Sequence, residues 1–289
     1  MPAQTVEITH QIEVSAEPKA VFDLVADPAG APRYAKSQLH AEVTDCGDGH
    51  DWVRRWVYAD GQTRCWTVLR QLDADALRIT FTPEDSAGDE RGQWEFLGGV
   101  DGSTLLRVSH TVAVAGPEAE DEVRARYDKN VPRQLAAYKL VAEAGPAQAD
   151  RYVHWEAEVP LDASETGAWQ RLEAPAPWIA LTERADGAEV TALTGDTERV
   201  DLTRRGEPAA QYIRIRPAGT SYLAFKRLDA PAGLAAIIGR WTVQAQGQRT
   251  LVGLAQTITL ARPGTAPIRA AAQDRLKLDL DRVAAAITS

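Results

Sequence analysis

Three side chains in the first half of the sequence are of types that can transfer protons or stabilise an oxyanion: His10, His110 and Arg70. His10 lies in an alternating apolar and polar run over 6–14, and His110 lies in a similar run over 105–114. In both runs the histidine has the parity of the apolar residues, so both imidazoles are expected on the buried face of a strand. A histidine there is either a satisfied core residue or a general acid or base. We predict His10 and His110 as catalytic candidates, and both alternatives stay open.

Arg70 is the third catalytic candidate. It shares the even parity of Trp66 and Val68 on a strand expected over 64–71. An inward guanidinium would stabilise a developing oxyanion or contact the phosphate-bearing end of a carrier-bound ligand. A surface arginine that pairs with Asp73 or with a neighbouring strand fits the same pattern, so the sequence leaves both roles open.

Aromatic and apolar residues with the same inward parity, or on the expected helices, would form either the core or the wall of a ligand cavity. The predicted substrate contacts in the first half are Tyr34, Trp66, Trp94, Phe96, Val108 and Tyr127. Those in the second half are Trp155, Tyr212, Trp241 and Gln256.

The elements that must position these residues occur twice. A Gly-x-Trp motif followed by a turn, an alternating strand and a long helix appears at 92–94 and again at 239–241. The two tryptophans are 147 residues apart in a chain of 289, and an offset that nearly halves a chain indicates an internal repeat. We therefore predict two domains, 1–145 and 146–289, each long enough to bury its own core.

Each half begins with a strand and a short helix, continues as strands separated by turn residues, and ends in an amphipathic helix. Short turns favour an antiparallel meander. In the first half Pro132 falls inside the closing helix and is expected to kink it or divide it in two. In the second half Pro175-Ala176-Pro177 is expected to break the short helix.

The two halves differ at the histidines. Ala157, which lies at the repeat offset, takes the place of His10, and Gln256 takes the place of His110. The first half is therefore favoured as the one that retains chemistry, and we expect its pocket to be the larger and more polar of the two.

This order of elements resembles the helix-grip fold of START domains, birch-pollen-allergen-like proteins and polyketide aromatase/cyclases. The likeness is strongest to the di-domain aromatase/cyclases of bacterial aromatic polyketide pathways. It rests on the doubling, on the run Trp66–Asp73, which is similar to that family's Trp-x-Ser-Arg-Arg-x-Leu-Asp strand, and on the run Gly92–His110. Val68 and Leu69 depart from that pattern at polar positions. A relative from an enediyne or other antibiotic pathway fits as well.

The resemblance implies an α+β protein of two tandem helix-grip domains, each a curved antiparallel sheet wrapped around a long C-terminal helix with an internal cavity. It also implies a hydrophobic polyketide ligand, carrier-bound or released, that is cyclised and aromatised by aldol condensation and dehydration. The alternative is a non-catalytic binding, carrier or self-resistance protein that sequesters a polyaromatic natural product.

Composition bears on the remaining partners. A net charge of −9 and a pI of about 5.2 argue against nucleic acid and anionic membranes as partners. The sequence contains no phosphate-binding glycine loop, nucleophile elbow or zinc motif, so we expect no metal and no cofactor. It also lacks a long apolar run and an N-terminal signal pattern, and we expect a cytoplasmic protein, monomeric or weakly homodimeric.

Overall fold

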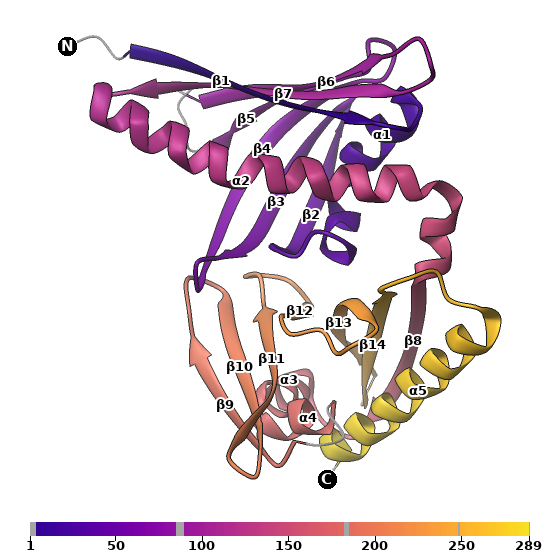
Figure 1. The fold of residues 1–289 in the computed structure, drawn as a ribbon. Helices are drawn as coiled ribbons and strands as arrows, with labels where there is room; N and C mark the ends of the chain where they lie inside the picture. The colour runs from indigo at the N-terminus through magenta and orange to yellow at the C-terminus, as the bar shows by residue number, and fades with distance from the viewer. Residues whose placement is uncertain (1–3, 85–89, 182–184, 248, 289) are drawn as a thin grey trace. The chain divides into compact units, whose positions relative to one another are not determined.

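The chain forms two compact units, each built on one antiparallel sheet (Figure 1). The computed structural model describes residues 4–84, 90–181, 185–247 and 249–288. One unit comprises Met1–Trp56 with Cys65–Pro146, and the other Val57–Arg64 with Ala147–Ser289. The α+β class and the doubling predicted from the sequence are confirmed, whereas the boundary between 145 and 146 stays a prediction.

In its described residues the first unit is built of strands, α-helices and a 3₁₀ segment. In chain order they are β1 (Gln4–Val14), α1 (Pro18–Ala26), η1 (Pro28–Arg33), β2 (Gln38–Gly47), β3 (His50–Ala59), β4 (Gln62–Asp73), β5 (Arg78–Pro83), β6 (Glu90–Gly98), β7 (Thr104–Val114) and α2 (Pro117–Ala144). The sheet order is β1-β7-β6-β5-β4-β3-β2. The first strand therefore pairs with the last, and the others follow as the predicted meander.

The second unit repeats this plan after the 3₁₀ segment η3 (Gly145–Arg151). Its elements are β8 (Tyr152–Leu161), α3 (Glu165–Glu173), α4 (Pro175–Ala180), β9 (Gly187–Ala192), β10 (Thr197–Arg204), β11 (Glu207–Ile215), β12 (Tyr222–Arg227), β13 (Leu234–Gln246), β14 (Arg249–Leu260) and α5 (Ala266–Thr288). The sheet order, β8-β14-β13-β12-β11-β10-β9, is that of the first unit.

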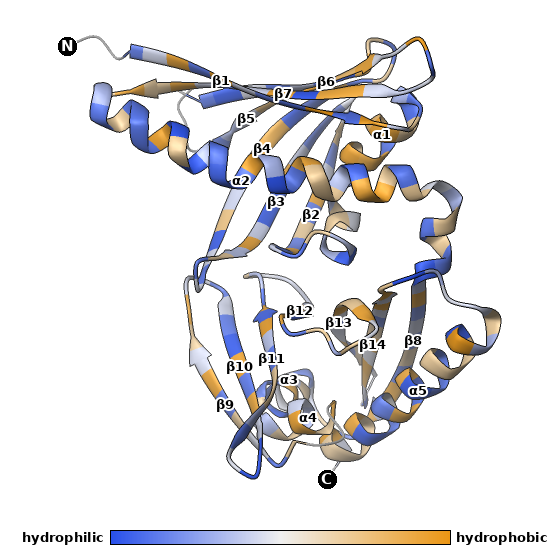
Figure 2. Cartoon of the chain, viewed as in Figure 1, coloured by the Kyte–Doolittle hydropathy of each residue, from blue (hydrophilic) through white to orange (hydrophobic). Residues whose placement is uncertain are grey.

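Helix α2 lies against β1, β7 and α1. Its fully buried residues, Val131, Leu135, Tyr138 and Val141, all fall in its C-terminal half. The N-terminal half is largely hydrophilic, as the blue colour in Figure 2 shows. Pro132 is exposed and lies inside one continuous helix, so the division allowed by the sequence does not occur. On an exposed side the carbonyl that loses its partner can turn to water, which lets the helix continue.

The prolines of the second unit break the short helix as expected, and they also begin a second one. Helix α3 ends at Glu173, but Pro175 then opens the short helix α4. Proline is favoured at the first position of a helix, because the amide hydrogen it lacks would have no partner there. The predicted break is thus a junction between two helices.

The Gly-x-Trp motif has a steric cause that is the same in both units. Gly92 on β6 is paired with Phe81 on β5, and Gly239 on β13 is paired with Phe225 on β12. A Cβ atom on either glycine would lie 2.3 Å from the Cζ atom of that phenylalanine. The missing side chain lets an aromatic ring lie flat across the neighbouring strand, while the tryptophan two residues later is buried in the same core.

We predict that Gly92→Ala destabilises the first unit, because the new methyl group meets the Phe81 ring and the Ser109 carbonyl oxygen, 2.6 Å away. The expected loss is about 1–3 kcal/mol in the free energy of unfolding, measured by urea denaturation. Gly98→Ala, on the same strand, is the control. Its Cβ atom would approach nothing closer than 3.4 Å, so equal losses in the two variants would contradict the steric explanation.

Candidate functional site

The pairing of β1 with β7 brings the two predicted histidines to neighbouring strands. His10 is opposite Val108, and His110 is opposite Ile8. The histidines are therefore diagonal neighbours on one face, a relation that places their Cα atoms roughly 7–8 Å apart. His110 is 8% exposed and the side chain of His10 is 14% exposed, so the predicted inward orientation of both is confirmed.

His110 lies among aromatic rings. Its ring centroid is 4.4 Å from that of Tyr127 on α2 and 5.4 Å from that of Phe81 on β5. Burial lowers the pKa of His110 to about 4, and the nearby His10 and Arg126 act in the same direction. His110 is therefore neutral near pH 7 and has a basic nitrogen available. Its Nδ1 atom is buried and has no hydrogen-bond partner in the described part of the chain.

Carboxylates on α2 and β6 orient the groups around His110. The Nε2 atom of His10 lies 2.8 Å from the Oδ1 atom of Asp128, while its Nδ1 atom is buried with no hydrogen-bond partner among the described residues. The Tyr127 hydroxyl donates to the Glu90 carboxylate. Burial, and then the Glu90 carboxylate, raise the pKa of Tyr127, so its hydroxyl stays protonated. Two imidazoles and one phenol thus meet between the sheet and α2.

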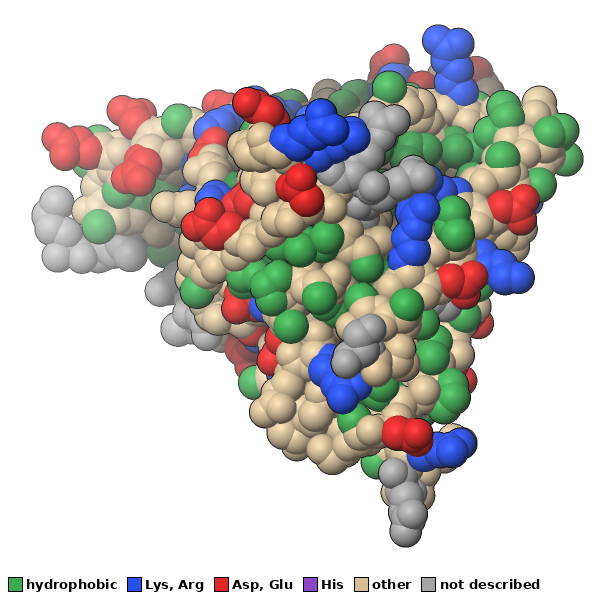
Figure 3. Space-filling model, turned by 90° about the horizontal axis from the view of Figure 1, so that it is seen from below, with side chains coloured by type: hydrophobic (Ala, Val, Ile, Leu, Met, Phe, Trp, Pro, Cys, Tyr) green, Lys and Arg blue, Asp and Glu red, His purple; other side chains and the backbone are tan. Residues whose placement is uncertain are grey.

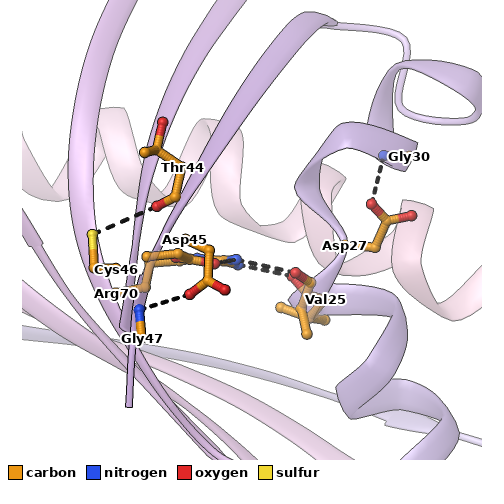
Figure 4. A network of polar contacts seen from close by, with 10 residues as sticks. Val25, Asp27, Gly30, Thr44, Asp45, Cys46, Gly47 and Arg70 are labelled. Carbon is orange, nitrogen blue, oxygen red and sulfur yellow. Dashed lines mark hydrogen bonds and ion pairs between the residues drawn. The ribbon is translucent and has the colours of Figure 1, made fainter. Parts of the chain in front are cut away.

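Arg70 is buried but fully engaged. Its Nε and Nη2 atoms donate to the two carboxylate oxygens of Asp51 on β3, at 2.8 and 2.6 Å. Its Nη1 and Nη2 atoms also donate to the carbonyls of Val25 and Ala26, at the C-terminal end of α1. Figure 4 shows Arg70 reaching from its strand to Val25, close to where Asp27 caps η1 through Gly30. The arginine therefore ties the sheet to the end of α1.

The second unit contains the same arginine clamp. Arg214 on β11 is paired with Phe225, as Arg70 is with Phe81. Its Nε atom donates to Glu198 on β10 at 2.6 Å, and its Nη1 atom donates to the Glu173 carbonyl at the end of α3. A clamp present in both units serves the fold. Of the two roles considered from the sequence, the described contacts support pairing with a neighbouring strand, although Arg70 is buried; its catalytic role stays a prediction.

Most predicted wall residues of the first unit are buried together. Trp94, Phe96 and Val108 belong to one apolar cluster, with Tyr34 and Tyr127 packed against it. Trp66, in contrast, is 37% exposed, because it lies beyond the part of β4 that pairs with β5, residues 68–73. Substrate contact at each of these positions stays a prediction.

The main cluster of the second unit is made of apolar and aromatic side chains. Tyr212 and Trp241 are 3% and 2% exposed within its main cluster, and Trp155 packs against that cluster. The rings of Trp178, Tyr212 and Phe225 meet edge to face at 5.5–6.1 Å. Gln256 is paired with Gly239 as His110 is paired with Gly92, which confirms their equivalence, and its Oε1 atom has no hydrogen-bond partner in the described residues.

Comparison with known proteins identifies the relatives of this chain. A family model described as polyketide cyclase/dehydrase and lipid transport matches residues 5–143, the first unit. The chain is 31% identical over 270 residues to the granaticin polyketide synthase bifunctional cyclase/dehydratase of Streptomyces virginiae, across 82% of this chain and 81% of that protein. The chain belongs to the family of polyketide bifunctional cyclase/dehydratases. It is also 27% identical over 252 residues to the actinorhodin cyclase/dehydratase of Streptomyces coelicolor, across 81% of this chain and 79% of that protein.

Solved structures confirm the fold of this cyclase/dehydratase relative. The di-domain ARO/CYC StfQ of the steffimycin pathway superposes with a TM-score of 0.80 at 20% identity, covering 97% of both chains. BexL of the BE-7585A pathway superposes with a TM-score of 0.81 at 22% identity, covering 98% of this chain and 97% of its own. Likeness at this identity concerns the architecture, which is the predicted pair of tandem helix-grip domains.

Sequence reasoning missed several groups in the first unit of this cyclase/dehydratase-family chain. Asp128 and Glu90 orient His10 and Tyr127, Asp51 holds Arg70, and Arg55 is discussed below. Asp128 is adjacent to Tyr127 on the helix that was expected to cover the histidine strands. That position could have indicated from the sequence that Asp128 lies near the histidines. Glu90 and Asp51 carry no such signal, because their partners come from other elements.

On the face seen in Figure 3, acidic and basic side chains are interspersed. Within the described residues no cluster of three or more His, Cys, Asp or Glu side chains is arranged to hold a metal ion. In the same residues no helix is long and apolar enough to cross a membrane.

We predict that His110 makes the stability of the protein depend on pH between about 6.5 and 4. The unfolded chain binds a proton at this residue near pH 6.5, and the folded chain does so only near pH 4, so the free energy of unfolding falls as the pH is lowered. The loss attributable to His110 is at most about 3 kcal/mol. Denaturation of the parent and of His110→Gln across this range should show a flatter profile for the variant. His154→Gln, which changes an exposed histidine, should keep the parent's profile; an unchanged slope in His110→Gln would contradict the assignment.

We also predict that Arg70→Met lowers the free energy of unfolding by about 3–5 kcal/mol, because it leaves the Asp51 carboxylate buried without its partner. The double variant Arg70→Met with Asp51→Leu should recover much of this loss. Urea denaturation measures both. A stable Arg70→Met protein that has lost only turnover would favour the catalytic role over the clamp.

Proposed function

We propose that this protein cyclises and dehydrates a polyketide, and that the chemistry takes place in the first unit. The observation that carries the proposal is the pair of buried imidazoles whose Nδ1 atoms have no hydrogen-bond partner in the described part of the chain. Family membership supports the reaction class, since the related granaticin and actinorhodin proteins are named bifunctional cyclase/dehydratases. The second unit, with Ala157 and Gln256 at these positions, then serves a structural role.

The reaction needs one base and one acid at the same face of the ligand. A neutral imidazole removes a proton from a methylene carbon between two carbonyls, and the resulting enolate carbon forms a bond to a ketone carbon. The alkoxide produced takes up a proton from an acid. Removal of a second proton from the adjacent carbon and departure of the protonated hydroxyl then release one water.

The described groups suit these steps. His110 is neutral and so has an unprotonated ring nitrogen, and His10 is held beside it by Asp128. The Tyr127 hydroxyl, kept protonated by burial and by Glu90, lies beside His110. The aromatic residues Trp94 and Tyr138, whose rings are 5.7 Å apart, would hold a flat conjugated chain.

Several finer statements belong to the same proposal. The ligand is a released or carrier-bound poly-β-keto chain, and the protein acts in the cytoplasm as a monomer or weak homodimer. Its two domains are 1–145 and 146–289. The alternative of a non-catalytic carrier or resistance protein is not favoured, because the matched relatives are named for catalysis.

The test is turnover of a pathway polyketide by His110→Phe. We expect the rate of cyclised, dehydrated product to fall on the order of 100-fold or more, since general acid–base catalysis contributes at least that factor. The phenyl ring fills the space beside Tyr127 and Phe81, so the fold should persist, as circular dichroism would verify. Mass spectrometry detects the missing loss of water.

Gln256→Phe is the matched variant, because it makes the same change at the equivalent position of the second unit. It should leave turnover close to that of the parent. If His110→Phe remains fully active while Gln256→Phe does not, the chemistry lies in the second unit instead.

A further inference from the structure

Arg55 on β3 is a half-buried cation whose Nε atom is fully buried, and it has no carboxylate of its own among the described residues. It shares the face of Asp51 and Val53, which are buried at 8% and 0% exposure. Its Nε atom is buried and has no hydrogen-bond partner among the described residues. A buried polar group without a partner costs free energy, so its presence calls for an explanation.

The charges around Arg55 do not balance. The groups that act on it electrostatically are Tyr138, Arg70, Tyr34 and Asp51. Both oxygens of Asp51 already accept hydrogen bonds from Arg70, so two guanidinium groups share one carboxylate. Burial lowers the pKa of Arg55 while Tyr138 acts in the opposite direction, and a guanidinium stays protonated under all ordinary conditions. The cluster thus carries an excess positive charge.

The fold itself does not require a cation at this position. Asp51 on β3 and Glu198 on β10 are equivalent, because each accepts a hydrogen bond from the arginine of its clamp. Four residues further along these strands, Arg55 is therefore equivalent to Leu202. Leu202 is 1% exposed in the apolar cluster of the second unit. The same architecture is therefore built with an apolar residue where the first unit holds a charge.

We propose that Arg55 is an anion-binding residue that holds a planar, delocalised oxyanion of the polyketide ligand in the interior of the first unit. Two kinds of ligand carry this chemistry, the enolate or phenolate of a conjugated ketone and the terminal carboxylate of a released chain. The planar guanidinium fork matches two such oxygens. The rings of Tyr34 and Tyr138, 6.1 Å apart, lie close by and suit a flat conjugated ligand.

This inference rests on the proposed function and extends it. An enolate held by Arg55 is the nucleophilic form of the chain in the aldol step, so the residue lowers the pKa of the carbon acid that His110 or His10 deprotonates. Removal of the charge would then affect both binding of the anion and the ease of deprotonation.

The experiment measures binding to the purified full chain without turnover. The probes are alizarin, whose colour reports the ionisation of its hydroxyl groups, an anthraquinone carboxylate, and the neutral hydroxymethyl anthraquinone of the same shape. We expect the parent to bind the carboxylate on the order of tenfold more tightly than the neutral probe, as a hydrogen bond between charged groups allows. It should also shift the ionisation of bound alizarin to lower pH.

Arg55→Gln should abolish the preference and the shift, and Arg55→Lys should retain part of both. Arg54→Gln is the matched control, because the adjacent residue loses the same charge from the opposite face of the strand, where it lies 4.5 Å from the Trp56 ring. Its binding should equal that of the parent. Arg55→Leu, which copies Leu202, should raise the midpoint of thermal unfolding by about 2–4 °C while losing anion binding.

Each outcome decides the matter. If Arg55→Gln loses only the alizarin shift, the ligand group is an enolate or phenolate. If it loses only the preference for the carboxylate probe, the ligand group is a carboxylate. A parent without anion preference, or an Arg55→Gln protein that binds like the parent, overturns the proposal. A parent that shows the preference but forms no cyclised product would overturn the proposed cyclase activity and leave this inference standing.

Discussion

The antiparallel pairing of β1 with β7 is the constraint on which the candidate site depends. It runs without a break from Gln4 opposite Val114 to Val14 opposite Thr104, and so joins the first strand of the unit to the last. Because side chains alternate along both strands, this register decides that His10 and His110 face the same side. A slip of β1 by one residue would turn His10 away from His110 and α2. Helix α2 follows β7 directly, and its contact with β1 brings Tyr127 and Asp128 to the histidines.

Parity and turn chemistry were sufficient to predict the strands, the doubling and the inward histidines, because these depend on local periodicity. The carboxylates that orient the site were beyond that reasoning. Asp128 meets His10 across 118 positions of sequence, and such a contact follows from how the helix lies on the sheet. Trp66 shows a limit of parity itself. It has the same parity as the buried Arg70 but is 37% exposed, because parity does not predict how far the neighbouring strand β5 extends along β4.

Comparison of the two units separates what the fold needs from what the site needs. The arginine clamp and the glycine that admits a phenylalanine ring occur in both, so each is part of the architecture. The histidines and Arg55 occur in one unit and are replaced in the other by Ala157, Gln256 and Leu202. The comparison also bears on the role of Arg70, which lies in the strand that resembles the family motif. Its counterpart, Arg214, lies in the unit that lacks the histidines, so the arginine clamp is present without them.

The unequal interiors have an energetic meaning. At the positions of His10 and Arg55 the second unit has the apolar residues Ala157 and Leu202, whose burial contributes roughly 25 cal/mol per Å² of apolar surface removed from water. The first unit gives up part of this stabilisation by placing imidazole, phenol and guanidinium groups under α2, and each unpaired polar atom there adds a desolvation cost. A ligand that satisfied those atoms would remove the cost on binding, so affinity arises from the same groups that weaken the empty fold. Among the described residues, the first unit has such atoms on His10, His110 and Arg55, whereas the second has one on Gln256. This difference is the structural argument for proposing that the first unit binds and transforms the ligand.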